Sequence, residues 1–138
     1  MDIDQPVRAT ALVRKENSIL MIHRFKPGEE YFVLPGGGVE IGETSEIAVV
    51  RELKEETSLI SKAREKIFEF IDVRGRSHQL FLCNYVAGDI KISVDSPEAS
   101  HTTKDNIFIP EWVQIKNLPD ITIWPSGTKD FLINYFKK

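Results

Sequence analysis

The stretch from Gly36 to Leu59, GGGVEIGETSEIAVVRELKEETSL, carries most of what the sequence says about fold and chemistry. It joins three glycines to a segment whose apolar residues suit one side of a helix. Thr44 is a suitable N-cap, and an acidic residue in the following turn is favoured by the helix dipole. We therefore predict a helix from Ser45 to about Thr57. The preceding Pro35 to Gly38 are expected to form a turn outside any helix or strand.

Three glutamates share one face of this predicted helix. Glu52, Glu55 and Glu56 are spaced by three and four residues, which places their Cβ atoms about 5–6 Å apart. Like charges that close repel, and a divalent cation would reverse the repulsion because Mg²⁺ prefers carboxylate oxygens. A solvated acidic face is the simpler interpretation of such a pattern. The glycines immediately upstream favour a binding site, because they let the backbone approach a ligand.

The spacing of these residues resembles the Nudix box, G-x5-E-x7-R-E-U-x-E-E-x-G-U, in which U is aliphatic. The matching run here is Gly37-x5-Glu43-x7-Arg51-Glu52-Leu53-x-Glu55-Glu56-x-Ser58-Leu59. Only Ser58 departs from the pattern, since the family has glycine there. The resemblance is to MutT-like, small single-domain members of the Nudix hydrolase family. It implies an α/β Nudix fold, an α/β/α sandwich with a mixed sheet, formed by residues 1–138 as one domain.

The resemblance also implies a reaction and a set of site residues. The expected reaction is metal-dependent hydrolysis of a nucleoside diphosphate linked to another group, X, with release of a nucleoside monophosphate. Mg²⁺ or Mn²⁺ would be bound by the carbonyl of Gly36 and by Glu52, Glu55 and Glu56. Glu43 and Arg51 would pair and hold the loop against the helix. The alternative is an inactive Nudix domain that only binds a nucleotide, but none of the box glutamates that such a domain would lose is missing.

The general base differs between branches of the family. Glu52, Glu55 or an acid on a later loop could serve in this chain. Glu98 and Asp105 are the loop candidates, and we favour Glu98 as the catalytic general base. A solvated loop carboxylate is the alternative interpretation of each.

The sequence says less about the substrate. Arg24, at the end of a predicted strand, and Gly37 are the expected substrate-binding residues, although Arg24 also suits an ordinary surface position. Some relatives carry a proline or a tyrosine beyond the box that marks ADP-ribose or dinucleoside polyphosphate cleavage. Val73 to Ser77 contains neither residue. By elimination, a deoxynucleoside triphosphate, ordinary or modified, is the favoured substrate.

Ser58 follows the predicted helix at a position that often needs a left-handed backbone. A serine there should cost about 1 kcal/mol. The cost would fall on the helix end and not on a ligand, so we expect activity to survive.

Composition limits the partners and the compartment. The chain has 138 residues, with 18 basic and 21 acidic side chains, and a formal charge of −3. This balance argues against nucleic acid as a partner but does not exclude a small phosphorylated ligand, and the resemblance implies a nucleotide-type small molecule as the substrate. No apolar run is long enough to span a bilayer, and the single cysteine, Cys83, excludes an intrachain disulfide. We expect a cytoplasmic protein without a membrane partner, and a homodimer is possible because many relatives dimerise.

The remaining elements follow from hydrophobic patterning and turn residues. We predict a hairpin from two apolar runs, further strands on either side of the central helix, a polar surface loop and a terminal helix. The predicted ranges are Ala9 to Val13, Ser18 to His23, Tyr31 to Leu34, Phe68 to Val73, Gln79 to Ala87 and Ile107 to Ile115 for strands, Asp95 to Asn106 for the loop, and Thr128 to Phe136 for the helix.

Overall fold

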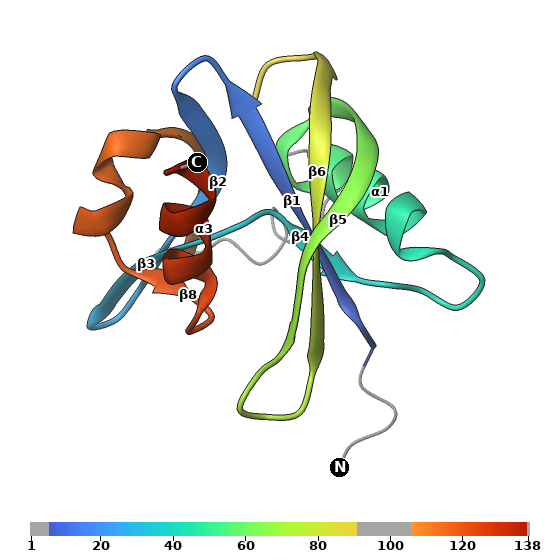
Figure 1. The fold of residues 1–138 in the computed structure, drawn as a ribbon, viewed down its shortest axis with the longest axis horizontal. Helices are drawn as coiled ribbons and strands as arrows, with labels where there is room; N and C mark the ends of the chain where they lie inside the picture. The colour runs from blue at the N-terminus through green and yellow to red at the C-terminus, as the bar shows by residue number, and fades with distance from the viewer. Residues whose placement is uncertain (1–5, 91–105, 138) are drawn as a thin grey trace.

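The computed structural model describes residues 6–90 and 106–137. Its strands and helices follow one another in the order shown in Figure 1. The elements are β1 (Arg8–Lys15), β2 (Ser18–Lys26), β3 (Glu29–Val33), β4 (Gly36–Gly38), α1 (Ser45–Thr57), β5 (Ile60–Ile71), β6 (Ser77–Ala87), β7 (Ile107–Gln114), the 3₁₀ helix η1 (Ile115–Asp120), β8 (Ile123–Trp124) and α3 (Thr128–Phe136).

The β1–β2 hairpin divides the sheet into two halves. The two strands pair only beside their turn, at Arg14 with Ile19 and Lys15 with Ser18, and then separate (Figure 1). Beyond that point β1 pairs with β6 in parallel and with β4 in antiparallel fashion. On the other side, β2 pairs with β3 and β7, and β3 pairs with β8 in parallel. The sheet is therefore mixed, as predicted, and it is open between its two halves.

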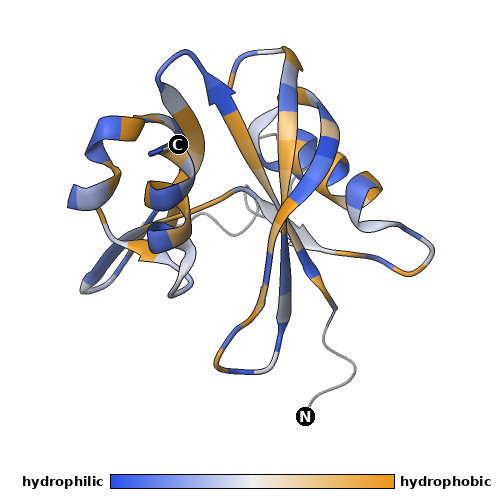
Figure 2. Ribbon diagram, in the orientation of Figure 1, coloured by the Kyte–Doolittle hydropathy of each residue, from blue (hydrophilic) through white to orange (hydrophobic). Residues whose placement is uncertain are grey.

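A helical layer covers each face of this sheet. Alternate residues of a strand point to opposite faces. Ala9, Ala11 and Val13 pack under α1, whereas Leu12 packs in the second core with Leu132 of α3 and Leu118 of η1. Figure 2 shows apolar stretches along the central strands and both apolar and polar residues on the helices. The predicted α/β/α arrangement is confirmed.

Helix α1 begins and ends at the predicted residues. The Thr44 hydroxyl accepts a hydrogen bond from the backbone N–H of Ile47 at 3.2 Å, so Thr44 is the N-cap. At the other end Ser58 has φ 68° and donates its N–H to the carbonyl of Lys54. The left-handed backbone expected at Ser58 is present. Cys83 is buried, and burial raises the pKa of its thiol to about 12.

Two predictions about strands were wrong. Gly36–Gly38, expected to lie outside any strand, forms β4 and pairs with Arg8, Ala9 and Thr10 of β1. Glycine propensity disfavours strands, but here the lack of side chains lets β4 lie against β1 on one side and α1 on the other. Strand β5 begins at Ile60 and not at Phe68, because long-range pairing with β6 carries it through a polar stretch. The other predicted strands and the helix Thr128–Phe136 are confirmed within a few residues.

Part of the sequence lies outside the described residues. Glu98 and Asp105 fall there, with the predicted loop apart from Asn106. Within the described part, none of the helices is long and apolar enough to cross a membrane.

Candidate active site

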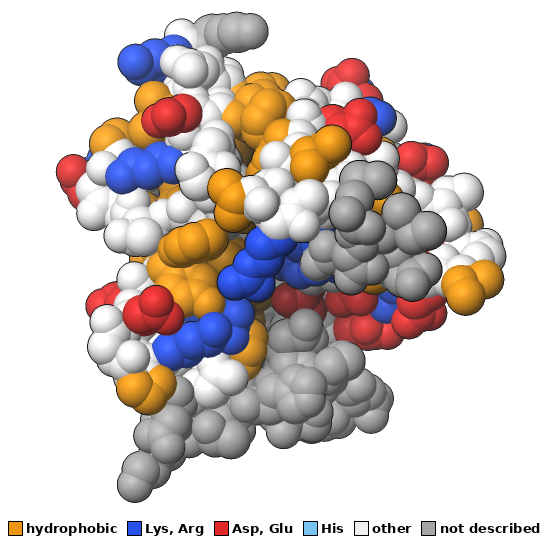
Figure 3. Space-filling view, turned by 90° about the horizontal axis from the view of Figure 1, so that it is seen from below, with side chains coloured by type: hydrophobic (Ala, Val, Ile, Leu, Met, Phe, Trp, Pro, Cys, Tyr) orange, Lys and Arg blue, Asp and Glu red, His pale blue; other side chains and the backbone are white. Residues whose placement is uncertain are grey.

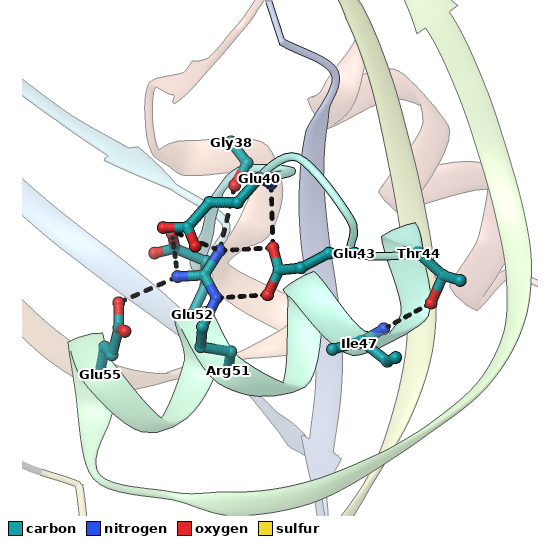
Figure 4. A network of polar contacts seen from close by, with 8 residues as sticks. All are labelled: Gly38, Glu40, Glu43, Thr44, Ile47, Arg51, Glu52 and Glu55. Atoms are coloured by element: carbon teal, nitrogen blue, oxygen red, sulfur yellow. Dashed lines mark hydrogen bonds and ion pairs between the residues drawn. The ribbon is translucent and has the colours of Figure 1, made fainter.

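Arg51 lies at the centre of a network that joins α1 to the loop before it. Its Nε and Nη2 atoms donate to the two carboxylate oxygens of Glu43, at 2.7 and 2.9 Å. Nη2 also donates to the carbonyl of Gly38 at 3.2 Å. Nη1 donates to Glu52 at 2.9 Å and to Glu55 at 3.2 Å. Figure 4 shows the guanidinium between these groups, so one cation fixes the loop, β4 and two of the three helix glutamates.

This network alters the acidity of its members. The hydrogen bonds from Arg51 lower the pKa of Glu43 to about 2, and the backbone N–H of Glu40 contributes in the same direction. The same carboxylate raises the pKa of Arg51 above its ordinary value, against the effect of burial. A bidentate guanidinium–carboxylate pair is among the stronger polar contacts in proteins. The contact expected between Glu43 and Arg51 is thus present.

The glycine segment lies directly against the other box glutamates. The backbone N–H of Gly36 donates to Glu56 Oε1 at 2.7 Å, and Glu56 is only 4% exposed. A Cβ on Gly37 would stand 2.4 Å from the carboxyl carbon of Glu52. Only glycine allows so close an approach, so Gly37 contacts a candidate metal ligand directly. Glu52 and Glu56 therefore lie against one backbone segment, with Glu56 the most enclosed.

The donors here fit a hard divalent cation in kind, since carboxylate and carbonyl oxygens are what Mg²⁺ and Mn²⁺ bind. In the present arrangement, however, these donors do not converge on one point. Among residues 6–90 and 106–137, no three acidic, histidine or cysteine side chains converge closely enough to hold a metal. Arg51 accounts for part of this, because its guanidinium binds Glu52 and Glu55. A metal ion would compete with Arg51 for those carboxylates.

A cleft of about 620 Å³ lies near the glycine segment in the sheet, although none of the three glycines lines it. Leu34 and Thr10 line it, and Thr10 pairs with Gly36 in the sheet. The wall is rich in basic and aromatic side chains, and Figure 3 shows Lys and Arg side chains gathered beside apolar ones, with an acidic group next to them. The basic residues are Arg8, Arg24, Lys26, Arg74 and Arg76, and the aromatic ones are Tyr31, Phe68, Phe70 and Trp124.

Arg24, expected to bind substrate, lies in this cleft. Its guanidinium stands over the ring of Phe108, 4.0 Å from the centroid, and 5.5 Å from that of Tyr31. It donates to the side chain of Asn106 at 3.2 Å. Arg24 is therefore held in a stacked position that leaves it beside the cleft.

Sequence reasoning missed the other basic residues of the cleft. Arg8 precedes the core of β1, and Arg76 lies in the β5–β6 turn, 68 positions later by subtraction of their numbers. The parallel pairing of β1 with β6 brings them to the same end of the sheet. No local sequence motif predicts that pairing. Only the parallel register, with Arg8 opposite His78, would have revealed it.

Comparison with known proteins agrees with this geometry. Residues 4–132 match the family model of the NUDIX domain. The chain is 35% identical to an ADP-ribose pyrophosphatase of Methanocaldococcus jannaschii, over 88% of this chain and 75% of that protein. It is 32% identical to an RNA pyrophosphohydrolase of Zymomonas mobilis, over 81% and 80% of the two chains. A solved MutT structure, from work on Aliivibrio salmonicida and Vibrio cholerae, superposes with a TM-score of 0.73 at 18% identity, over 99% of both chains.

The chain belongs to the NUDIX domain family. Membership and the activities named for its relatives make it an enzyme of the class that hydrolyses phosphorus-containing anhydrides.

Proposed function

We propose that this enzyme is a metal-dependent pyrophosphohydrolase that cleaves a nucleoside diphosphate linked to X and releases a nucleoside monophosphate. The observation that carries the proposal is the position of Glu56, a nearly buried carboxylate anchored to the backbone of Gly36. Burying a charged group is costly unless a counter-charge or hydrogen bonds compensate. A binding site for a cation and a phosphate chain would explain why a carboxylate is kept at this nearly buried position.

The proposed metal ligands are the carbonyl of Gly36 and the carboxylates of Glu52, Glu55 and Glu56, with Mg²⁺ or Mn²⁺ as the ion. When bound, such an ion polarises phosphoryl oxygens and lowers the pKa of a coordinated water. The chain's own residues supply the frame. Arg51 keeps Glu52 and Glu55 oriented toward the loop, and Glu43 keeps Arg51 in place. Gly37 is proposed to let the substrate approach Glu52 without obstruction.

The proton acceptor for the attacking water is a separate proposal. Glu98 is the first candidate, and Glu52 and Glu55 are the alternatives within the described helix. A test is to measure the pH dependence of kcat in Glu98→Gln and Glu55→Gln. The base is the residue whose removal abolishes the acidic limb of the profile. A Glu98→Gln enzyme with an unchanged profile would exclude Glu98.

The relatives' activities bear on the identity of X. An ADP-ribose pyrophosphatase and an RNA pyrophosphohydrolase each match most of the chain. We propose ADP-ribose and a 5′-phosphorylated RNA end as substrates to test before the free triphosphates that sequence elimination favoured. The RNA end departs from the expectation, drawn from the charge balance of the chain, that nucleic acid is not a partner. The basic cleft supports this choice, because it has more Lys and Arg side chains than one diphosphate group needs.

The test is a substrate panel with Mg²⁺, with Mn²⁺ and with EDTA. It comprises ADP-ribose, 5′-triphosphorylated RNA, deoxynucleoside triphosphates, an oxidised deoxyguanosine triphosphate and dinucleoside polyphosphates. We expect turnover of at least one compound, with a nucleoside monophosphate as product, or 5′-monophosphorylated RNA where the substrate is RNA, and loss of this turnover in EDTA. Tight binding without any turnover would favour the nucleotide-binding module instead. Turnover that persists in EDTA would refute the metal requirement.

A further inference from the structure

Two arginines from distant parts of the sequence meet at one end of the cleft. Arg8 begins β1 and lies opposite His78 of β6 and opposite Gly38 of β4 in the sheet register. Arg76 lies in the turn that leads into β6, and its Nη2 atom is 3.5 Å from the position that a Cβ on Gly38 would take. Both side chains line the cleft. Arg8 is therefore level with the end of β4 in the sheet, and the Arg76 guanidinium lies beside the same residue, Gly38.

The charges around this pair do not balance. Burial lowers the pKa of Arg76, the positive charge of Arg8 lowers it further, and Asp72 acts in the opposite direction. Within residues 6–90 and 106–137, neither arginine forms an ion pair with a carboxylate. Arg8 donates to the carbonyl of Leu34 at 3.5 Å, and Arg76 donates through Nε to the carbonyl of Pro6 at 2.9 Å. Most of their donors remain available.

Asp72, the acid whose charge acts on Arg76, uses its carboxylate for hydrogen bonds within the β5–β6 hairpin. Its Oδ1 atom accepts from the backbone N–H groups of Arg74 and Arg76, at 2.8 and 3.1 Å. Its Oδ2 atom bonds to Nε2 of His78 at 2.8 Å. These bonds fix the turn that carries Arg76, which lines the cleft and, among the residues that the structure describes, forms no ion pair with a carboxylate. Asp72 thus positions the cation without pairing with it.

We propose that Arg8 and Arg76 form an anion subsite for a phosphate group that the substrate carries outside the diphosphate being hydrolysed. Two guanidinium groups present paired N–H donors that match phosphate oxygens, and an anion between them would relieve their repulsion. The subsite is adjacent to the candidate active site through Gly38. Arg76 approaches this residue from the cleft, and Arg51, which holds Glu52, donates to its carbonyl.

This inference rests on the proposed function and narrows its substrate class. The substrate would be a nucleotide with a phosphate monoester or diester in addition to its anhydride. A 2′- or 3′-phosphate on the ribose, or the internucleotide phosphate of an RNA 5′ end, has this chemistry. A substrate with only the diphosphate would leave the pair empty.

Matched ligand pairs test the subsite without catalysis. Affinities are measured by isothermal titration calorimetry in EDTA for NADH and NADPH, for dephospho-coenzyme A and coenzyme A, and for a nucleoside triphosphate and a 5′-triphosphorylated dinucleotide. We expect the member with the extra phosphate to bind about tenfold or more tightly in at least one pair, the size of a charge-assisted hydrogen bond. Arg8→Gln and Arg76→Gln should abolish that difference. Arg64→Gln, which removes the same charge from an exposed site on β5, should leave it unchanged.

Three outcomes would overturn the subsite. The first is that the two ligands of every pair bind the wild type with equal affinity, and the second is that the preference for the extra phosphate survives in both arginine variants. The third is that the variants lose affinity equally for both ligands of a pair, which would assign the arginines to the diphosphate itself. Arg8→Gln is the cleaner variant, because the one hydrogen bond of the Arg8 side chain within the described residues is the long contact to Leu34, whereas Arg76 makes a shorter one to Pro6. Arg76→Lys keeps the charge and serves as a check on folding, with thermal melting as the measurement. If the preference holds while no compound is hydrolysed with metal present, the proposed function fails and the subsite stands.

Discussion

The carboxylate of Glu56 accepts a hydrogen bond from the backbone N–H of Gly36 at 2.7 Å, across 20 positions of sequence. This bond connects the last turn of α1 to the first residue of β4. With the Gly37 backbone against Glu52, it makes the glycine segment and the helix face one unit. The helix cannot shift along its axis without breaking a hydrogen bond to a buried carboxylate, and such bonds contribute about 1.5–3 kcal/mol. The glutamates are therefore held in place before any ligand arrives.

Replacing Glu56 with glutamine removes the charge of the side chain and keeps its shape. The amide oxygen of Glu56→Gln can still accept the bond from Gly36, so the fold should be retained. The proposed metal would lose a charged ligand, and a loss of about 3 kcal/mol of transition-state stabilisation is about a hundredfold in rate. We expect kcat/KM to fall by that factor, measured on the best substrate of the panel.

Glu46→Gln is the matched control, because Glu46 is an exposed glutamate in the first turn of the same helix. Its activity should equal that of the wild type. If Glu56→Gln kept more than about a tenth of the activity, a difference of less than about 1.4 kcal/mol, Glu56 could not be a principal metal ligand.

The sequence predicted those parts of the fold that depend on local signals. Helix α1 is bounded by the cap at Thr44 and the left-handed Ser58, and both are encoded within a turn of the helix. Strand β4 was missed because its formation depends on pairing with β1, not on its glycines. The shared face of the three glutamates could be predicted because their spacing on a helix alone determines it. The proximity of Arg8 and Arg76 could not be predicted, since only the parallel β1–β6 register brings them together.

The Glu43–Arg51 pair should make stability depend on pH in the acid range. The pKa of Glu43 is about 2 in the folded protein and 4.5 ordinarily. Its contribution to stability is therefore complete above pH 4.5 and is lost as the pH falls toward 2. Glu43→Gln lacks this contribution at every pH. We expect the difference in free energy of unfolding between wild type and variant to shrink from pH 5 to pH 2, measured by urea denaturation.

Asp72 provides an internal reference for this experiment. Its pKa is also lowered to about 2, chiefly by the hydrogen bond with His78, so it adds an acid-range loss to both proteins. Both should therefore become less stable on acidification, with the wild type falling more steeply. A difference that stayed constant over this range would show that the Glu43 carboxylate gains nothing from Arg51.

Ser58→Gly should stabilise the protein slightly. Ser58 has φ 68°, a conformation that costs a non-glycine residue about 1 kcal/mol. A glycine also makes the unfolded chain more flexible, which offsets part of the gain, so we expect about 0.5 kcal/mol in the free energy of unfolding. Activity should not change, since Ser58 is a helix cap. Glu16→Gly, at φ 56° in the β1–β2 turn, should behave in the same direction.

Ser45→Gly is the opposing control, because Ser45 lies within the first turn of α1. There glycine has only its entropic cost, and the free energy of unfolding should fall by about 0.5–1 kcal/mol. A Ser58→Gly protein that is no more stable than the wild type would refute the strain at the helix end.

Alanine at the two neighbouring glycines should separate stability from activity. A Cβ at Gly36 would meet the backbone oxygen of Ala9 at 2.1 Å, and backbone cannot yield as a side chain does. We expect Gly36→Ala to lower the free energy of unfolding by about 1–3 kcal/mol, the usual cost of overpacking. A Cβ at Gly37 would instead meet the carboxyl group of Glu52, which can rotate away. Gly37→Ala should therefore remain folded and lose activity, because Glu52 leaves its place.

Gly42→Ala completes the series, because Gly42 has φ 89° and no atom near its missing Cβ. It should show the strain of a left-handed alanine, about 1 kcal/mol, with normal activity in the folded protein. Thermal melting and kcat/KM are measured on all three variants, so that the loss of stability and the loss of activity can be compared for each. Parallel losses of stability and activity in Gly37→Ala would mean that Gly37 serves the fold alone. A loss of kcat/KM at nearly full stability would establish that the position of Glu52, set by the glycine beside it, limits the reaction.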